Sequence, residues 1–155
     1  CWGLERVRGS FVRGAVVTEE IERTMDMGTM ANQDDPRLRD RRWMAEVMGQ
    51  VASHARRMHD EGFAHNDLKW RNLLVDDGDV PTVYLIDCPN GAFWRGPLLR
   101  YRIVKDLACL DKIGKYRLSR TQRLRFYLDY AGHDRLSAAD KRRIRKVLKF
   151  FEGRE

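Results

Sequence analysis

Cysteine and long apolar runs are scarce in this chain of 155 residues. Its three cysteines, Cys1, Cys88 and Cys109, form no C-x-x-C pair, so the sequence supports neither a disulfide framework nor a zinc site and suits a reducing compartment. No apolar run approaches the roughly twenty residues that a membrane span needs, and no signal-peptide pattern opens the chain. These absences predict a cytoplasmic protein.

Acidic residues are the minority charge. The chain has 30 Lys and Arg against 23 Asp and Glu, a net charge of +7, with the excess towards the C-terminus. Such a charge favours anionic partners, namely nucleic acid, a phospholipid surface or a phosphorylated glycolipid. No nucleic-acid-binding motif is present, so we expect no nucleic-acid partner. At 43% hydrophobic residues, the chain is long enough for one domain with its own core.

One polar stretch, His65-Asn66-Asp67-Leu68-Lys69-Trp70-Arg71-Asn72, is followed by a short apolar run, Val83 to Ile86, that ends on Asp87. The apolar run is bounded by prolines and rich in β-favouring residues, which predicts a strand. Leu73 to Val75 predicts its hairpin partner, with Asp76 to Asp79 as the turn. This arrangement would present the acidic groups of both segments together.

The polar stretch matches the pattern H-x-D-L-x-x-x-N of kinase catalytic loops. In such a loop Asp67 would accept the proton of the acceptor hydroxyl, and Lys69 would direct its ammonium at the γ-phosphate of ATP. Asn72 and Asp87 would bind Mg²⁺, a hard cation that prefers oxygen ligands and keeps several waters. His65 is more readily explained as structural support than as a catalytic group. The alternative for the whole stretch is an ordinary polar turn after a helix.

Two further regions narrow the resemblance to the bacterial lipopolysaccharide kinase family of the Kdo/WaaP type. Gly14 to Ile21 resembles that family's last N-lobe strand running into the hinge, and Lys105 to Ala108 with Leu118 to Phe126 resembles its C-terminal helices. The resemblance implies an α+β fold, a protein-kinase-like C-terminal lobe that is mainly helical, with short β-hairpins at the hinge and the catalytic loop. It also implies that Asp106 is a buried carboxylate that holds the catalytic loop by accepting its backbone amides.

The chain departs from the kinase pattern in three places. Asp87-Cys88-Pro89 stands where protein kinases carry D-F-G, and Asn66 replaces the usual Arg before the catalytic Asp. The glycine-rich loop, strand lysine and helix glutamate that the family implies do not precede Gly14. We therefore expect residues 1–22 to be the end of an N-lobe sheet and the hinge, and residues 23–155 to be a C-lobe. The piece would belong to a longer enzyme and be inactive alone; a degenerate kinase is the alternative.

The N-terminal region predicts the nucleotide contacts. Residues 1–14 alternate loosely, which predicts one strand and a tight turn, with a second strand from Val16. In the hinge that follows, backbone groups at Glu19 and Ile21 would bind the adenine edge of ATP. Asp26 is a candidate for the ribose hydroxyls, with a solvated turn residue as the alternative.

Apolar spacings of three and four, together with helix-capping residues, predict the helices beyond the hinge. They are expected at Pro36–Gly62, Arg102–Ile113 and Leu118–Ala131, and from Ser137 to near Gly153. Residues 89–97 have breakers at both ends and no period, which predicts a loop at the mouth of the cleft. In it Phe93 and Trp94 either face a sugar or pack under the loop.

Basic residues gather in two places. Arg95, Arg100 and Arg102 either bind acceptor phosphates or form a solvated basic face. The last helix carries six Lys and Arg between Lys141 and Lys149, and this face is either simply solvated or attracted to an anionic inner-membrane surface. Such attraction is worth about 1 kcal/mol per charge near the surface.

Together these patterns predict an ATP- and Mg²⁺-dependent phosphotransferase whose acceptor is a sugar hydroxyl, of Kdo or heptose, in the lipopolysaccharide inner core. The expected partners are that core glycolipid and, by peripheral contact, the inner membrane. The alternatives are an atypical protein kinase or aminoglycoside-type kinase and a pseudokinase that acts as a binding module. Lys69 and Asp106 argue against the aminoglycoside type.

Overall fold

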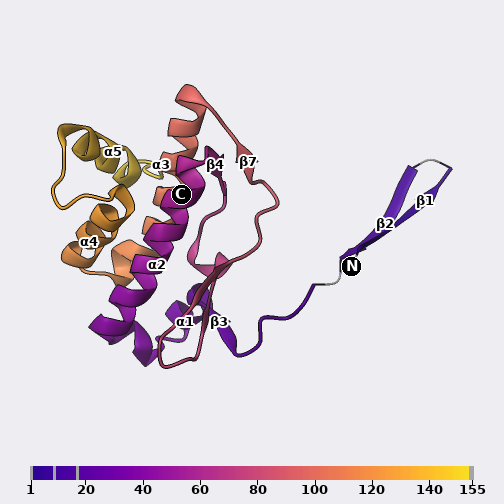
Figure 1. Ribbon diagram of the computed structural model, residues 1–155, viewed down its shortest axis with the longest axis horizontal. Coiled ribbons are helices and arrows are strands. Elements are labelled where there is room, and N and C mark those ends of the chain that lie inside the picture. The colour runs from indigo at the N-terminus through magenta and orange to yellow at the C-terminus, as the bar shows by residue number, and fades with distance from the viewer. Residues whose placement is uncertain (1, 9, 17, 154–155) are drawn as a thin grey trace.

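The computed structural model describes residues 2–8, 10–16 and 18–153 (Figure 1). The elements follow in the order β1 (Trp2–Val7), β2 (Ser10–Val16), β3 (Thr24–Asp26), α1 (Met27–Asn32), η1 (Pro36–Arg39), α2 (Arg41–Asp60), β4 (Phe63–Ala64), η2 (Trp70–Asn72), β5 (Leu73–Asp76), β6 (Val83–Leu85), β7 (Ala92–Phe93), α3 (Gly96–Arg117), α4 (Arg120–Ala131) and α5 (Ala138–Leu148), where η marks a 3-10 helix. The predicted α+β class and the mainly helical character are confirmed.

The first hairpin stands apart from the helices, joined to them by an extended segment (Figure 1). β1 and β2 pair antiparallel from Trp2↔Val16 to Val7↔Ser10. Arg8 turns the chain with a left-handed φ of 51°. The predicted start of the second strand at Val16 is therefore wrong, because the loose alternation of residues 1–14 spans two strands and their turn. Val17, which the prediction also included, lies outside the described residues.

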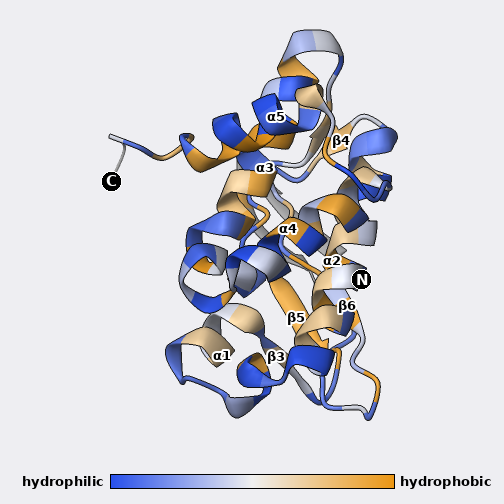
Figure 2. Cartoon of the chain, turned by 90° about the vertical axis from the view of Figure 1, so that its left-hand side faces the viewer, coloured by the Kyte–Doolittle hydropathy of each residue, from blue (hydrophilic) through white to orange (hydrophobic). Residues whose placement is uncertain are grey.

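The second sheet lies in the helical part and has the order β3-β5-β6, antiparallel throughout. Its register pairs Leu73 with Leu85 and Val75 with Val83, which confirms the hairpin predicted from the sequence. The turn is held by Asp76, whose Oδ1 accepts the backbone N–H of Thr82 at 2.9 Å. The first three residues of β5 are apolar, and the strand lies among the helices (Figure 2).

Helix α2 carries the core. Val47, Val51 and Ala55, spaced four apart, are fully buried, as the apolar period predicts. The predicted single helix from Pro36 is divided in two, because the carboxylate of Asp40 accepts the N–H groups of Arg42 and Trp43 and so caps a new helix start. The helix ends at Asp60, before Gly62 with φ 80°.

The C-terminal helices differ from prediction mainly at their boundaries. α3 begins at Gly96 instead of Arg102, because Pro97 fits the first helical turn, where its missing N–H costs nothing. α4 starts next to Ser119 and α5 starts with a capping box at Ser137, both as predicted, and Ser119 also forms a capping box. α5 ends at Leu148 and not near Gly153. None of the helices in the described residues combines the length and the apolar content that a membrane crossing requires.

The predicted loop 89–97 contains a short strand. Within it β7 pairs antiparallel with β4, with Phe63 opposite Phe93 and Ala64 opposite Ala92. A strand of two residues shows no periodicity in the sequence, and its partner lies some thirty residues earlier in the chain. The pairing ties the segment after Asp87 to the segment before His65.

Candidate active site

The loop His65–Asn72 connects β4 to β5 and is shaped by backbone hydrogen bonds. Asn66 has a left-handed φ of 65°, and its side-chain Nδ2 donates to the carbonyl of Asn90 at 2.6 Å. The amide of Lys69 donates to the carbonyl of Asp67 at 2.9 Å, and the amide of Asn72 to that of Lys69 at 2.8 Å. The loop therefore turns back on itself within eight residues.

This turn brings three of the predicted site residues into contact. Lys69 Nζ lies 2.6 Å from Asp67 Oδ2, and each of the two side chains is 29% exposed. Asn72 Nδ2 donates to the Asp67 carbonyl at 2.8 Å and to Asp67 Oδ2 at 3.3 Å. Partial burial opposes ionisation of the Asp67 carboxyl, but the hydrogen bonds and charge of Lys69 and the bond from Asn72 outweigh it and lower the pKa of Asp67. Asp67 is thus an ionised hydrogen-bond acceptor at neutral pH.

Asp87 is delivered next to this loop by strand pairing. The amide of Ile86 donates to the Asn72 carbonyl at 3.1 Å, extending the β5–β6 ladder by one step. The chain then turns sharply at Asp87, with φ 56°, and exposes its side chain.

The oxygens of Asn72 and Asp87 suit a hard cation. Within the described ranges, no hydrogen bond reaches Asn72 Oδ1 or the Asp87 carboxylate. An amide oxygen and a carboxylate oxygen are ligands that Mg²⁺ prefers, and the ion normally completes its shell with phosphate and water. A cluster of three or more His, Cys, Asp or Glu side chains that could form a protein-only metal site is not found in the described part of the chain. The donor set fits magnesium held together with a nucleotide.

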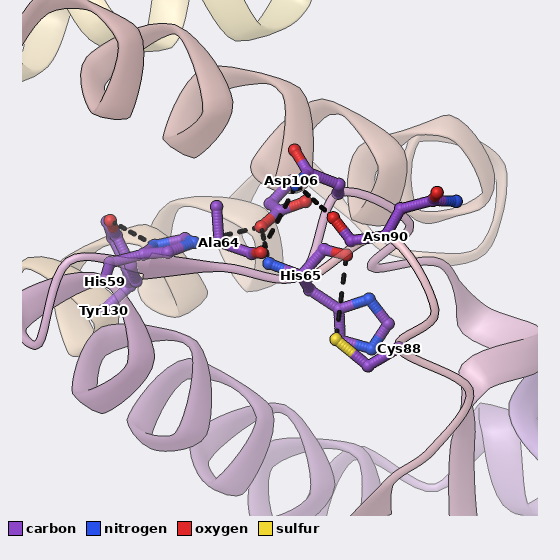
Figure 3. Close-up of polar contacts among 8 residues, drawn as sticks. His59, Ala64, His65, Cys88, Asn90, Asp106 and Tyr130 are labelled. Atoms are coloured by element: carbon purple, nitrogen blue, oxygen red, sulfur yellow. Dashed lines mark hydrogen bonds and ion pairs between the residues drawn. The ribbon is translucent and has the colours of Figure 1, made fainter. Parts of the chain in front are cut away.

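Behind the loop, Asp106 of α3 is fully buried and joined to the backbone of His65 (Figure 3). The His65 N–H donates to Asp106 Oδ2 at 2.8 Å, and His59 Nε2 lies 3.3 Å from the same oxygen. His59 Nδ1 lies 2.9 Å from the hydroxyl of Tyr130. A carboxylate only accepts, so His59 carries its proton on Nε2, and Nδ1 accepts the Tyr130 O–H. One hydrogen-bonded chain thus links α4, α2 and α3 to the catalytic loop.

His59 and Tyr130 were not identified from the sequence. His59 lies four residues after Ala55, on the apolar face of α2, and a polar residue on such a face is a detectable signal. Tyr130 is buried, and its burial raises the pKa of its phenol, so it remains a donor. His65 also supports the loop, since its Nε2 lies 3.2 Å from the carbonyl of Ile86 beside Asp87.

The predicted nucleotide contacts lie before β3 and at its end, and β3 packs against η2 of the loop. Glu19 is exposed, and Ile21 lines a cavity of about 440 Å³ together with His54, Arg57, Met58, Val83, Tyr84 and Leu85. The Ile21 carbonyl accepts the hydroxyl of Thr24 at 2.8 Å. Asp26 caps α1, where its Oδ1 accepts the N–H of Thr29 at 2.8 Å. These contacts give Ile21 and Asp26 structural roles, and their roles towards ATP stay predictions.

A larger cavity, about 480 Å³, lies among α3, α4 and α5, and its lining does not include Asp67 or Asp87. Trp70 is its one lining residue from the catalytic loop, and the indole N–H donates to the carbonyl of Leu110 at 3.0 Å. The candidate active site is therefore defined by the loop and the strand end, and the cavity is a separate feature of the helical layer.

Comparison with known proteins agrees with this geometry. The model of the lipopolysaccharide kinase (Kdo/WaaP) family matches residues 2–130. A solved structure of WaaP in complex with acyl carrier protein superimposes with a TM-score of 0.74 at 24% sequence identity, over 99% of this chain and 65% of that chain. This match confirms the predicted kinase-like fold, and it shows that the chain spans about two thirds of that relative. No curated protein sequence matches the chain. The family match covers most of the chain, which therefore belongs to the lipopolysaccharide kinase (Kdo/WaaP) family.

Proposed function

We propose that the chain carries the catalytic lobe of a kinase that transfers the γ-phosphate of ATP to a sugar hydroxyl, of Kdo or heptose, in the lipopolysaccharide inner core. One observation carries the proposal. Asp67, Lys69 and Asn72 touch one another in a loop whose next strands deliver Asp87 beside it. Membership of the lipopolysaccharide kinase family supports the acceptor class.

Asp67 would accept a hydrogen bond from the acceptor hydroxyl and orient it towards the γ-phosphate. Its lowered pKa makes it a weak base. That is compatible with phosphoryl transfer, because the transition state is loose and alignment matters more than early removal of the proton. Lys69, whose side chain is 29% exposed, can exchange one oxygen of Asp67 for an oxygen of the γ-phosphate.

Asn72 and Asp87 would hold Mg²⁺ through the Asn72 amide oxygen and the Asp87 carboxylate, which accept no hydrogen bond within the described ranges. When bound, the ion would neutralise charge on the nucleotide phosphates. The protein's own contribution is to keep these ligands at fixed separation, through the Ile86–Asn72 backbone hydrogen bond. Asp106, His59 and His65 would act as positioning residues that fix the backbone of the loop.

The remaining partners are proposed by similarity. Backbone groups at Glu19 and Ile21, with Asp26, are candidates for ATP contacts in the intact protein. The solved relative is in complex with acyl carrier protein, which makes an acyl carrier protein a candidate partner of the intact protein. The exposed basic residues of α5 support a cytoplasmic protein in peripheral contact with the inner membrane.

The test is phosphate transfer from labelled ATP to purified dephosphorylated lipopolysaccharide core by the intact protein. We expect transfer that is lost in Asp67→Asn. The matched control is Asp79→Asn, the same change at an exposed position in the β5–β6 turn, which should transfer at the wild-type rate. ATP binding without any transfer to the glycolipid would refute the proposed acceptor.

A further inference from the structure

Three large apolar side chains lie exposed at the start of α3. Phe93 is 74% exposed, Leu98 59% and Tyr101 47%. Leu98 and Tyr101 are three residues apart and share one face of the helix. Single exposed apolar residues are ordinary, but several within one short segment indicate a surface that is covered by something else. These three residues are called the Phe93 surface below.

The Phe93 surface is supported from beneath. The rings of Phe63 and Phe93 pack edge to face with centroids 5.2 Å apart, and Tyr101 lies 5.6 Å from the ring of Phe150. The chain leading into it is also fixed, since a Cβ at Gly91 would lie 2.3 Å from the sulfur of Cys88. The exposed side chains therefore project from a well-packed base.

The segment that carries this surface has charge of one sign. Residues 88–105 contain no Asp or Glu, whereas they contain Arg95, Arg100, Arg102 and Lys105. The neighbouring α5 packs on α3 and adds exposed basic residues, namely Lys141, Arg142, Arg145 and Lys146, with Lys149 just beyond its end. An anionic partner is favoured. Exposed aromatic and aliphatic groups beside arginines and lysines match a bilayer interface, where the apolar groups enter the acyl boundary and the cations meet headgroups.

The surface is close to the candidate active site. β7 and the first turns of α3 lie beside β4 (Figure 1), and β4 leads directly into His65. Phe93 itself pairs with Phe63 across the β4–β7 ladder. A lipid-anchored sugar presented at this surface would lie near Phe63, which precedes Asp67 by only a few residues in the chain.

We propose that the Phe93 surface inserts into the surface of an anionic lipid bilayer and so docks the catalytic loop on a lipid-anchored acceptor. The docking role rests on the proposed function, but the insertion is independent of it. This contact is distinct from the electrostatic attraction of α5, because it is made by apolar side chains. Because arginines surround the Phe93 surface and α5 is basic, the apolar insertion and the electrostatic attraction of α5 both favour an anionic membrane.

The test is sedimentation of the intact protein with vesicles of phosphatidylcholine mixed with phosphatidylglycerol, compared with vesicles of phosphatidylcholine alone. The protein should sediment with the anionic vesicles, and Leu98→Ser and Phe93→Ser should each weaken partition roughly five- to tenfold. Leu98→Ser is the cleaner change, because Phe93 also contacts Phe63. Arg100→Glu should weaken partition by a similar factor.

The matched control is Tyr116→Ser, because Tyr116 is 76% exposed at the other end of the same helix, between Lys115 and Arg117. It should partition as the wild type does. Equal loss in Tyr116→Ser, unchanged partition in Leu98→Ser, or equal binding to neutral vesicles would each overturn the proposal. Failure of the intact protein to sediment would also overturn it, and would indicate that a protein segment covers the surface.

A second readout separates this proposal from the proposed function. Leu98→Ser should transfer phosphate to a deacylated, water-soluble core oligosaccharide at the wild-type turnover number, while losing transfer to the same acceptor in vesicles. If Asp67→Asn remained active on the soluble acceptor, the proposed catalytic role would fail while the vesicle result would stand. If both acceptors lost activity equally in Leu98→Ser, the docking role would fail.

Discussion

Two carboxylates in this molecule are held in opposite ways. Asp140 at the start of α5 is 5% exposed, and both of its oxygens are occupied. Oδ1 accepts the Tyr127 hydroxyl at 3.0 Å, and Oδ2 accepts the Ser137 N–H at 2.9 Å and lies 2.9 Å from His133 Nε2. Asp67 is 29% exposed, and its contacts to Lys69 and Asn72 converge on one oxygen, Oδ2.

This difference in hydrogen bonding suits the two carboxylates to different roles, one in stabilising the fold and one in binding a substrate. A carboxylate whose acceptor positions are filled by the protein stabilises the fold and has nothing left for a ligand. A carboxylate that keeps one oxygen and part of its surface open can accept a substrate hydroxyl. The loop around Asp67 also holds Asn66 and the nearby Asp87 in left-handed backbone conformations, which cost energy and are maintained by the surrounding packing.

Asp67→Asn should give the largest effect. Loss of a positioned acceptor should lower the turnover number by a factor on the order of 10² to 10⁴. The free energy of unfolding should change by less than about 1 kcal/mol, because the ion pair with Lys69 is partly exposed. Turnover on core glycolipid and urea unfolding measure the two quantities. A stable variant with unchanged turnover would contradict the assignment.

Asp140→Ala should lower the stability of the fold and leave the turnover number unchanged, the opposite of Asp67→Asn. It leaves the donors of Tyr127 and Ser137 unpaired, so the free energy of unfolding should fall by about 2 to 3 kcal/mol while the folded protein keeps its turnover number. Hydrogen bonds from Ser137 lead the causes that hold the pKa of Asp140 far below its usual range, against the effect of burial. Its contribution is therefore complete above the ordinary Asp pKa and is lost only as pH falls through the lower folded value. Asp134→Ala, in the exposed loop before α5, is the control.

Asp87→Asn should weaken metal binding. Removing a charged oxygen ligand should raise the Mg²⁺ concentration for half-maximal activity by at least about tenfold. A magnesium titration of transfer activity, with Asp79→Asn beside it, measures this shift. An unchanged Mg²⁺ dependence would exclude Asp87 as a ligand.

Lys69→Met should lower the turnover number by removing the proposed γ-phosphate contact, and it should also displace the pH profile. Without the hydrogen bond and charge of Lys69, which both lower it, the pKa of Asp67 rises from its value in the unaltered protein. Asp67 acts when ionised, so the acidic limb of kcat/KM should move to higher pH. Arg71→Met, which removes a weaker charge effect on Asp67, should move the limb less in the same direction. An acidic limb that did not move in Lys69→Met would show that another group sets it.

Local signals account for what the sequence predicted. The β5–β6 hairpin follows from two β-favouring runs and an acidic turn, and α4 begins directly after Ser119 because Ser119 and Gln122 form a capping box within four residues. The loop His65–Asn72 could be predicted because the spacing of its polar residues matches the pattern of kinase catalytic loops. Contact of Lys69 with Asp67 then follows from the tight turn between them.

Long-range pairing accounts for what the sequence did not predict. β7 exists only because β4 is its partner, and the His59–Asp106 contact joins residues 47 apart in the chain. The late predicted start of α3 has a different cause. Gly96 and Pro97 break a helix in its middle but suit its first turn, and only the packed structure shows which applies.

The segment between Asp87 and α3 is held in place by the residues around it. It is fastened at Asn90 by the side chain of Asn66, at Trp94 by the carbonyl of Gly62, and between them by the β4–β7 pairing. Because this short segment is attached at three points, its backbone has little freedom to change conformation. We therefore expect this segment to keep the same conformation whether or not nucleotide is bound.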